Sequence, residues 1–76
     1  MVRVLFFGPL AEITRCTSIQ MQGCADTEML QQALYNQFPA LANRKFAIAV
    51  NKTIVKEKTL LSAGFEVAFL PPFSGG

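Results

Sequence analysis

The group in this sequence that is best placed to do chemistry is the carboxylate of its last residue, Gly76. It ends the segment Pro71-Pro72-Phe73-Ser74-Gly75-Gly76, in which two prolines follow an apolar run and two glycines form the tip. Prolines lack an amide donor and fix φ, so they end a strand and keep the chain extended. Glycine has no side chain, so a Gly-Gly tip can enter a constricted channel. We therefore expect residues 71–76 to project about 15 to 20 Å and to carry the Gly76 carboxylate into a partner's active site.

The sequence does not contain the usual machinery of a catalyst. It has no His, no GxxxxGK[ST] phosphate loop and no nucleophile elbow. Its carboxylates fall at no spacing that suggests an acid–base pair: Glu12, Asp26, Glu28, Glu57 and Glu66. Cys16 and Cys24 lack CxxC spacing, and with no His available a metal site would have too few good ligands. We expect no metal, two reduced cysteines without a chemical role, and no catalysis by this chain alone.

Size and composition restrict the class of protein further. Seventy-six residues allow one small domain, yet 51% of them are hydrophobic and seven are Phe, more than so small an interior readily hides. Some apolar surface should therefore face a partner. The net charge of +2 is too slight to argue for nucleic acid, and we interpret the basic residues of one segment as a solvated rim: Arg44, Lys45, Lys52, Lys56 and Lys58. No membrane span or signal peptide is apparent, so we expect a cytoplasmic protein.

The apolar pattern predicts five strands, at residues 2–7, 17–22, 46–50, 53–55 and 65–70, and one amphipathic helix at residues 27–38. Asp26 or Thr27 can cap the helix, Pro39 stops it, and its apolar residues recur at three- and four-residue steps. Residues 9–14 read as a connection with room for a helical turn, and Asn51-Lys52 as a tight turn. A single main helix can cover only one face of the sheet, so we predict an α+β roll.

Side-chain alternation predicts which residues the uncovered face exposes. Arg3 and Glu66 mark the solvent side of the first and last strands, and Lys52 marks that of the fourth. The apolar residues that share this side form a predicted docking patch close to the tail: Leu5, Phe7, Ile54, Ala68 and Leu70. Nothing else in the chain is left to cover them.

The segments VRVLFFGPLAE, AVN and EVAFLPPFSGG together resemble the small subunit of molybdopterin synthase, the MoaD-type sulfur carriers of the β-grasp (ubiquitin-like) class. The resemblance spans essentially the whole chain, and its most specific part is the tail. It implies a domain at residues 1–70 and an extended tail at 71–76. It also implies a mixed sheet of four to five strands with the first and last strands parallel at its centre.

The same resemblance implies a function. A MoeB/ThiF-type E1-like enzyme would use ATP to adenylate Gly76, and a cysteine desulfurase system would supply the sulfur of a thiocarboxylate. That sulfur would enter a MoaE-type large subunit, in a 2+2 heterotetramer, and convert precursor Z into the dithiolene of molybdopterin. Gly76 is then the reacting group and Gly75 part of the tip. Pro71 and Pro72 support the tail, Phe73 and Ser74 complete the inserted segment, and no cofactor is bound by the chain itself.

Three other functions fit parts of the sequence. A ThiS-like carrier for thiazole synthesis shares the fold and the Gly-Gly end, and a ubiquitin-like modifier uses the same activation. An adaptor that binds through the sheet face would need no free terminus. Two places also depart from the family pattern: Ala63-Gly64-Phe65, where relatives tend to carry acidic residues, and Phe73, where a smaller aliphatic residue is common.

Overall fold

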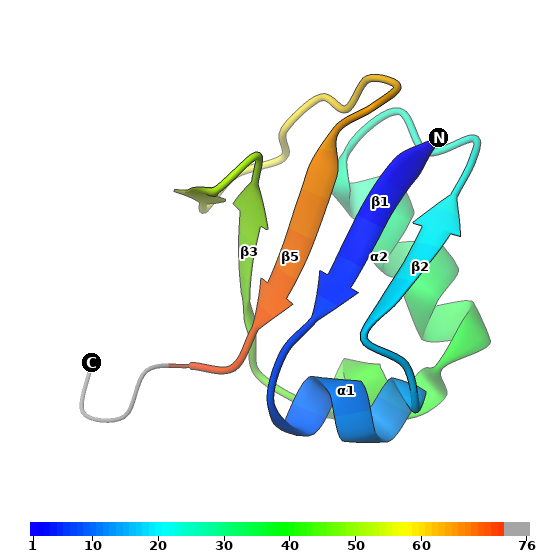
Figure 1. Ribbon diagram of the computed structural model, residues 1–76, viewed down its shortest axis with the longest axis vertical. Helices are drawn as coiled ribbons and strands as arrows, with labels where there is room; N and C mark the ends of the chain where they lie inside the picture. Colours follow the sequence, from blue (N-terminus) through cyan, green and yellow to red (C-terminus); the bar gives the residue numbers. More distant parts are fainter. Residues whose placement is uncertain (73–76) are drawn as a thin grey trace.

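The computed structural model describes residues 1–72, which form one five-stranded sheet and its helices (Figure 1). The elements follow one another as β1 (Val2–Phe6), α1 (Pro9–Thr14), β2 (Ser18–Met21), α2 (Thr27–Gln37), the 3₁₀ helix η1 (Pro39–Asn43), β3 (Ala47–Val50), β4 (Thr53–Val55) and β5 (Glu66–Leu70). This mixed sheet with one main helix is the predicted α+β fold of the β-grasp type.

The sheet places the two ends of the described chain side by side at its centre. The strand order is β2-β1-β5-β3-β4, with β1 and β5 parallel and every other neighbouring pair antiparallel. Parallel strands need a long crossover connection, and here everything between β1 and β5, including α2, supplies it. Because β5 ends at the same edge as β1, the chain leaves the sheet from a central strand (Figure 1).

Helix α2 forms where the sequence supplies both a cap and an apolar stripe. Asp26 is the residue that caps it, and its side chain accepts a hydrogen bond from the Met29 amide at 2.9 Å. Leu30 and Leu34, one turn apart, are completely buried against the sheet. Figure 1 shows α2 behind the sheet, so the opposite face carries no helix within residues 1–72.

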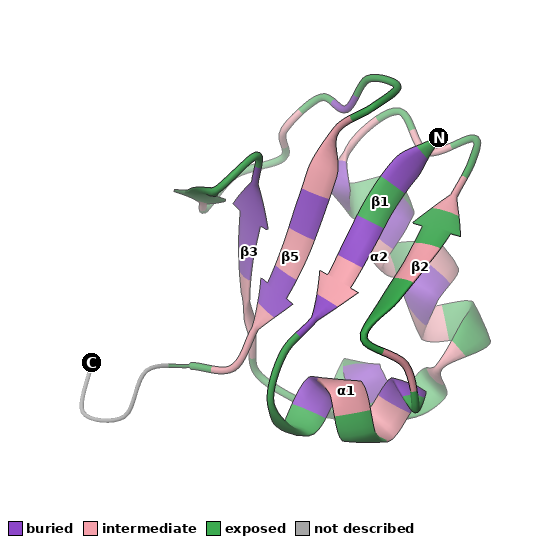
Figure 2. Cartoon of the chain, in the orientation of Figure 1, coloured by how far each residue is buried: buried purple, intermediate pink, exposed green. Residues whose placement is uncertain are grey.

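The core lies between α2 and the inner face of the sheet. Alternate residues of the central strands point into it, and Val4, Val67 and Phe69 have no exposed surface (Figure 2). The Phe69 ring lies 5.8 Å from that of Phe6 and 5.0 Å from that of Phe46, centroid to centroid, within the range of favourable aromatic pairs. These contacts hold the last strand rigidly at the point where the tail begins.

A two-residue turn joins β3 to β4 and also holds the start of β5. Asn51 and Lys52 both have positive φ, 49° and 72°, which is the conformation of a type I′ hairpin. Asn51 donates its amide to the Glu66 carbonyl at 2.7 Å, and its side-chain oxygen accepts from the Glu66 amide at 2.9 Å. The predicted tight turn is confirmed, and it gains a second role in fixing where β5 starts.

Several predicted boundaries were wrong by one residue or more. The strands predicted at 2–7, 17–22, 46–50 and 65–70 are shorter, and the helix predicted at 27–38 ends at Gln37. The connection at 9–14 is a complete short helix, started by Pro9 and closed by Arg15 in the left-handed conformation. Helix η1 was not predicted; it begins with Pro39 and buries Leu41 under the core.

Strand β5 ends at Leu70, where the predicted domain also ends. The division into residues 1–70 and a tail of residues 71–76 stays a prediction, because only Pro71 and Pro72 of the tail are among the described residues. Within residues 1–72, no helix has the length and apolar character that crossing a membrane requires.

Candidate functional site: the root of the tail and the open sheet face

The root of the tail is held between neighbouring parts of the fold. The Phe7 amide donates to the Phe69 carbonyl at 3.1 Å, which extends the pairing of β1 and β5 beyond Phe6. Pro71, half-buried, lies against Gly8: a β-carbon built on Gly8 would be 3.3 Å from the Pro71 Cγ. Gly8 has φ +56°, a conformation that favours glycine. The direction in which the chain leaves β5 is therefore set by packing up to Pro71.

The open face of the sheet carries an apolar row that runs across four strands. In the register of the sheet, Ile54 pairs with Ala49, Ala49 with Ala68, and Ala68 with Leu5. Paired residues of neighbouring strands share a face, so all four side chains point away from α2. Leu70 pairs with Ala47 one row closer to the tail. The structure thus brings the predicted docking residues to one face.

We call this surface the outer patch, and its members are Leu5, Phe7, Ala49, Ile54, Ala68 and Leu70. Phe7 and Ile54 are exposed over 45% and 47% of their surface, Leu5, Ala68 and Leu70 are half-buried, and Ala49 is buried, with 5% exposed. Figure 2 shows this face toward the viewer, with half-buried positions alternating with buried ones along β5. Ala49 was not predicted, because in the run Ala47-Ile48-Ala49-Val50 no polar residue marks which side faces solvent.

A polar row borders the outer patch at the end away from the tail. Arg3 pairs with Gln20 on one side and with Glu66 on the other, so these three residues share the open face. The prediction of this face depended on Arg3 and Glu66 as solvent markers, and the register places the two side by side. The outer patch is thus displaced toward the end of the sheet from which the tail leaves.

The remaining predicted site residues are Phe73, Ser74, Gly75 and Gly76, and they lie outside the described residues. Pro71 and Pro72 are described, and follow β5 directly. The predicted roles of all six stay predictions. Within residues 1–72, no group of three or more His, Cys, Asp or Glu side chains could hold a metal ion.

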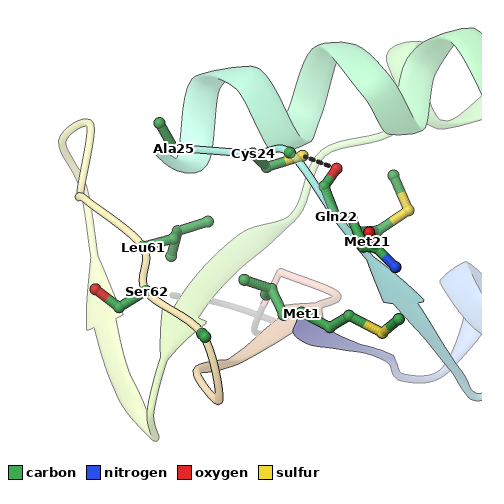
Figure 3. Close-up of a pocket in the computed structure, with 10 residues that line it drawn as sticks. Met1, Met21, Gln22, Cys24, Ala25, Leu61 and Ser62 are labelled. Carbon is green, nitrogen blue, oxygen red and sulfur yellow. Dashed lines mark hydrogen bonds between the residues drawn. The ribbon is translucent and has the colours of Figure 1, made fainter.

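A pocket of about 590 Å³ opens at the opposite end of the sheet, around Met1, Met21, Cys24 and Leu61 (Figure 3). The Cys24 thiol donates to the Gln22 carbonyl at 3.8 Å. Burial raises the pKa of this thiol, and the negative charge of Asp26 adds to the effect. Because the thiolate is the nucleophilic form, this environment makes Cys24 less reactive. Among the described residues, the pocket contains no feature that would activate a nucleophile, and it lies at the end of the sheet opposite the tail root.

Comparison with known proteins identifies the family. The model of the ThiS family matches residues 4–76. The molybdopterin synthase sulfur carrier subunit of Escherichia coli (strain K12) is 36% identical over 81 residues, which cover 100% of both chains.

Two solved structures have the same fold. Small archaeal modifier protein 1 from Methanosarcina acetivorans has a TM-score of 0.84 at 23% identity, covering 99% of this chain and 95% of that one. This likeness shows the fold alone. The second is a protein–protein complex of subunits 1 and 2 of the molybdopterin-converting factor from Helicobacter pylori 26695. Its matching chain has a TM-score of 0.73 and 28% identity, covering 99% of this chain and 97% of that one. Because the family model matches residues 4–76 and the chain is 36% identical to a sulfur carrier subunit over its whole length, the chain belongs to the ThiS family of ubiquitin-like β-grasp proteins.

Proposed function

We propose that this protein is the sulfur carrier subunit of a molybdopterin synthase, acting in the cytoplasm. The observation that carries the proposal is the end-to-end match to a sulfur carrier subunit of that synthase, at 36% identity. The structure supports it physically, because a central strand leads into the tail and, within residues 1–72, an apolar sheet face with exposed Phe7 and Ile54 lies beside the tail root. A carrier needs both features, one to aim the cargo and one to bind the acceptor.

The reaction begins at Gly76 and uses groups that other proteins supply. An E1-like enzyme of the MoeB/ThiF type joins the Gly76 carboxylate to AMP from ATP, releasing pyrophosphate. A donor system, such as one fed by a cysteine desulfurase, supplies a persulfide whose outer sulfur attacks the acyl carbon of the glycyl adenylate and displaces AMP. A thiol then cleaves the resulting acyl disulfide: the thiol forms a disulfide with the donor's sulfur, and the outer sulfur stays on the acyl carbon. The product is a thiocarboxylate (1-thioglycine) at residue 76. This chain binds no cofactor in the scheme, because ATP is used by the activating enzyme.

The acceptor is a MoaE-type large subunit, arranged with this chain as a 2+2 heterotetramer. The outer patch docks on it, and the tail enters its active site as far as Gly76. Docking converts a bimolecular sulfur transfer into one within a complex, which raises the effective concentration of the sulfur. The precursor, a cyclic pyranopterin monophosphate also called precursor Z, takes up two sulfur atoms to form the dithiolene of molybdopterin. The chain itself supplies cargo and position rather than acid–base catalysis.

Intact-mass spectrometry tests the proposal directly. The protein is incubated with ATP, its own organism's E1-like enzyme and a sulfur source, and then with the large subunit and the pterin precursor. We expect a mass gain matching the replacement of one oxygen by sulfur, its loss on addition of large subunit and precursor, and no gain after deletion of Gly76. Addition of one residue after Gly76 should abolish the reaction as well.

Other results would exclude the proposal in distinguishable ways. Attachment of the chain to lysines of other proteins would assign it to the ubiquitin-like modifiers. A thiocarboxylate consumed only by a thiazole-forming enzyme would make it a ThiS-like carrier. Full function of the extended chain would identify an adaptor that uses the sheet face alone.

A further inference from the structure

Two basic residues lie beside the root of the tail, on the side of β3. The pairing of β3 with β5 ends with Ala47 opposite Leu70. Lys45 precedes Ala47 by two residues and Pro72 follows Leu70 by two, so Lys45, with Arg44 immediately before it, lies at the end of the sheet from which the tail leaves. Both side chains are exposed. The two positive charges therefore flank the path on which the tail leaves the domain.

The backbone that carries this pair is held in place on both sides. Before it, the Arg44 amide donates to the carbonyl of the buried Leu41 at 3.1 Å, and Arg44 itself is extended, with φ −115° and ψ 147°. After it, the Phe46 ring packs at 5.0 Å from that of Phe69. The pair is thus a fixed part of the surface around the tail rather than part of a loose loop.

No acidic residue lies within ten positions of this pair along the sequence, so no sequence neighbour balances its charge. All five carboxylic side chains are within the described residues. Asp26 and Glu28 stand at the start of α2, and Glu66 opens β5 at the end of the strand away from the tail root. Glu28 and Glu57 line a groove that also includes Phe46 and Ala47, the residues directly after Lys45. Glu12, in α1, is the one at the same end of the sheet.

We propose that Arg44 and Lys45 bind carboxylates at the mouth of the channel that receives the tail. The inference rests on the proposed function, and it specifies the chemistry of the partner: an apolar surface against the outer patch, continued by an acidic rim on the β3 side of the tail. A partner that admits residues 73–76 must bring the edge of its channel against Pro72, and hence against this pair. Opposite charges there orient the two proteins before the tail enters.

Charges of this kind act mainly on the rate of association. Exposed ion pairs add little to affinity in salt solution, but complementary fields speed encounter and select its orientation. The effect is screened by salt over about 8 to 10 Å at ordinary ionic strength. Association of the carrier with its large subunit should therefore slow as salt is added, and this dependence should weaken when the pair is neutralised or reversed.

The test measures association of the full-length carrier with the large subunit of its own organism by stopped-flow fluorescence between low and high salt. The variant is R44E together with K45E. Its matched control, K56E together with K58E, makes the same change in net charge beside the start of α2. We expect the first variant to associate about tenfold more slowly at low salt and the control less than about threefold, with the rates converging at high salt. The association rate of R44Q together with K45Q at low salt should lie between those of the wild type and of R44E/K45E.

Each outcome has one interpretation, provided that circular dichroism shows both variants folded. Equal slowing by R44E/K45E and K56E/K58E would overturn the inference, because only net charge would matter. Normal association of R44E/K45E with a raised KM for ATP during activation would overturn it too and assign the pair to nucleotide binding. If wild-type protein neither binds the large subunit nor transfers sulfur to it, the proposed function itself fails.

Discussion

Phe7 leaves 45% of its surface exposed although it directly follows a central strand. Its amide is used in pairing with Phe69, so its backbone is fixed while its ring stays uncovered. A large ring held in this way costs little conformational entropy on binding, which suits an anchor of an interface. At the scale of the single residue, Phe7 is the part of the outer patch that should matter most.

Replacement of Phe7 by Glu should abolish binding to the large subunit, because it would place a charge in a desolvated apolar contact. Leu70→Glu should do the same. Isothermal titration calorimetry measures the loss, and far-UV circular dichroism should stay unchanged. Met29→Glu is the matched control, since Met29 is exposed to nearly the same degree, 48%, but stands on α2 behind the sheet. Equal loss in Met29→Glu, or unfolding of Phe7→Glu, would contradict the assignment of Phe7 to the interface.

At the scale of the element, the hairpin turn between β3 and β4 has two roles: it joins these strands and it holds the start of β5. Type I′ turns favour Asn followed by Gly, and this chain has Asn51 followed by Lys52. A lysine at φ 72° carries a steric cost of about 1 kcal/mol that glycine avoids. Asn51, by contrast, uses both its amide and its side chain to hold Glu66.

Lys52→Gly should therefore raise the free energy of unfolding by about 0.5 to 1 kcal/mol, and Asn51→Ala should lower it by about 1 to 2 kcal/mol. Urea denaturation measures both changes on one scale. Asn51→Asp tests the cause, because it keeps an oxygen acceptor for the Glu66 amide and a preference for the left-handed region. A loss from Asn51→Asp as large as that from Asn51→Ala would show that the hydrogen bond to Glu66 is not the source.

Elements with local signals were predictable from the sequence, and those that depend on distant contacts were not. The cap and stripe of α2 and the Asn51-Lys52 turn are each contained in a few consecutive residues. Helix α1 is only six residues long, too short for a periodic pattern, and η1 is held by the burial of Leu41. The parallel pairing of β1 with β5 joins opposite ends of the chain. That pairing was predicted from the family resemblance, because the alternation of side chains along the strands does not indicate which strands pair.

The residues of the candidate site were likewise predictable only where a local signal in the sequence marked them. Arg3 and Glu66 predict which side of the sheet is open, because a charged residue in a strand points to solvent. Four docking residues follow from them by alternation. Ile54 follows in the same way from Lys52. Ala49 could not be identified, since its neighbours in β3 are all apolar and none marks the solvent side. Arg44 and Lys45 belonged to a general basic segment in the sequence, and only the pairing of β3 with β5 shows that they lie at the end of the sheet where the tail begins.

At the scale of the whole molecule, a domain this small has a narrow margin of stability, about 3 to 5 kcal/mol. Docking should widen it, because a partner that binds only the folded state stabilises that state. Amide hydrogen exchange measures the effect at the slowest protons of β1 and β5. With free large subunit at 100 times its Kd, their exchange through global unfolding should slow by about 100-fold. Phe7→Glu should show no such protection, and protection of that variant equal to wild type would mean that the contact lies elsewhere.

The position of β5 also decides how the domain bears mechanical load. An enzyme that grips the tail pulls along β5, and the hydrogen bonds of this strand to β1 on one side and to β3 on the other run across that line of force. The bonds on both sides of the strand resist such a pull together, whereas an outer strand such as β2 or β4 is held by bonds on one side. If the tail enters a tight channel as proposed, this double pairing would let the domain be pulled by its tail with the sheet intact.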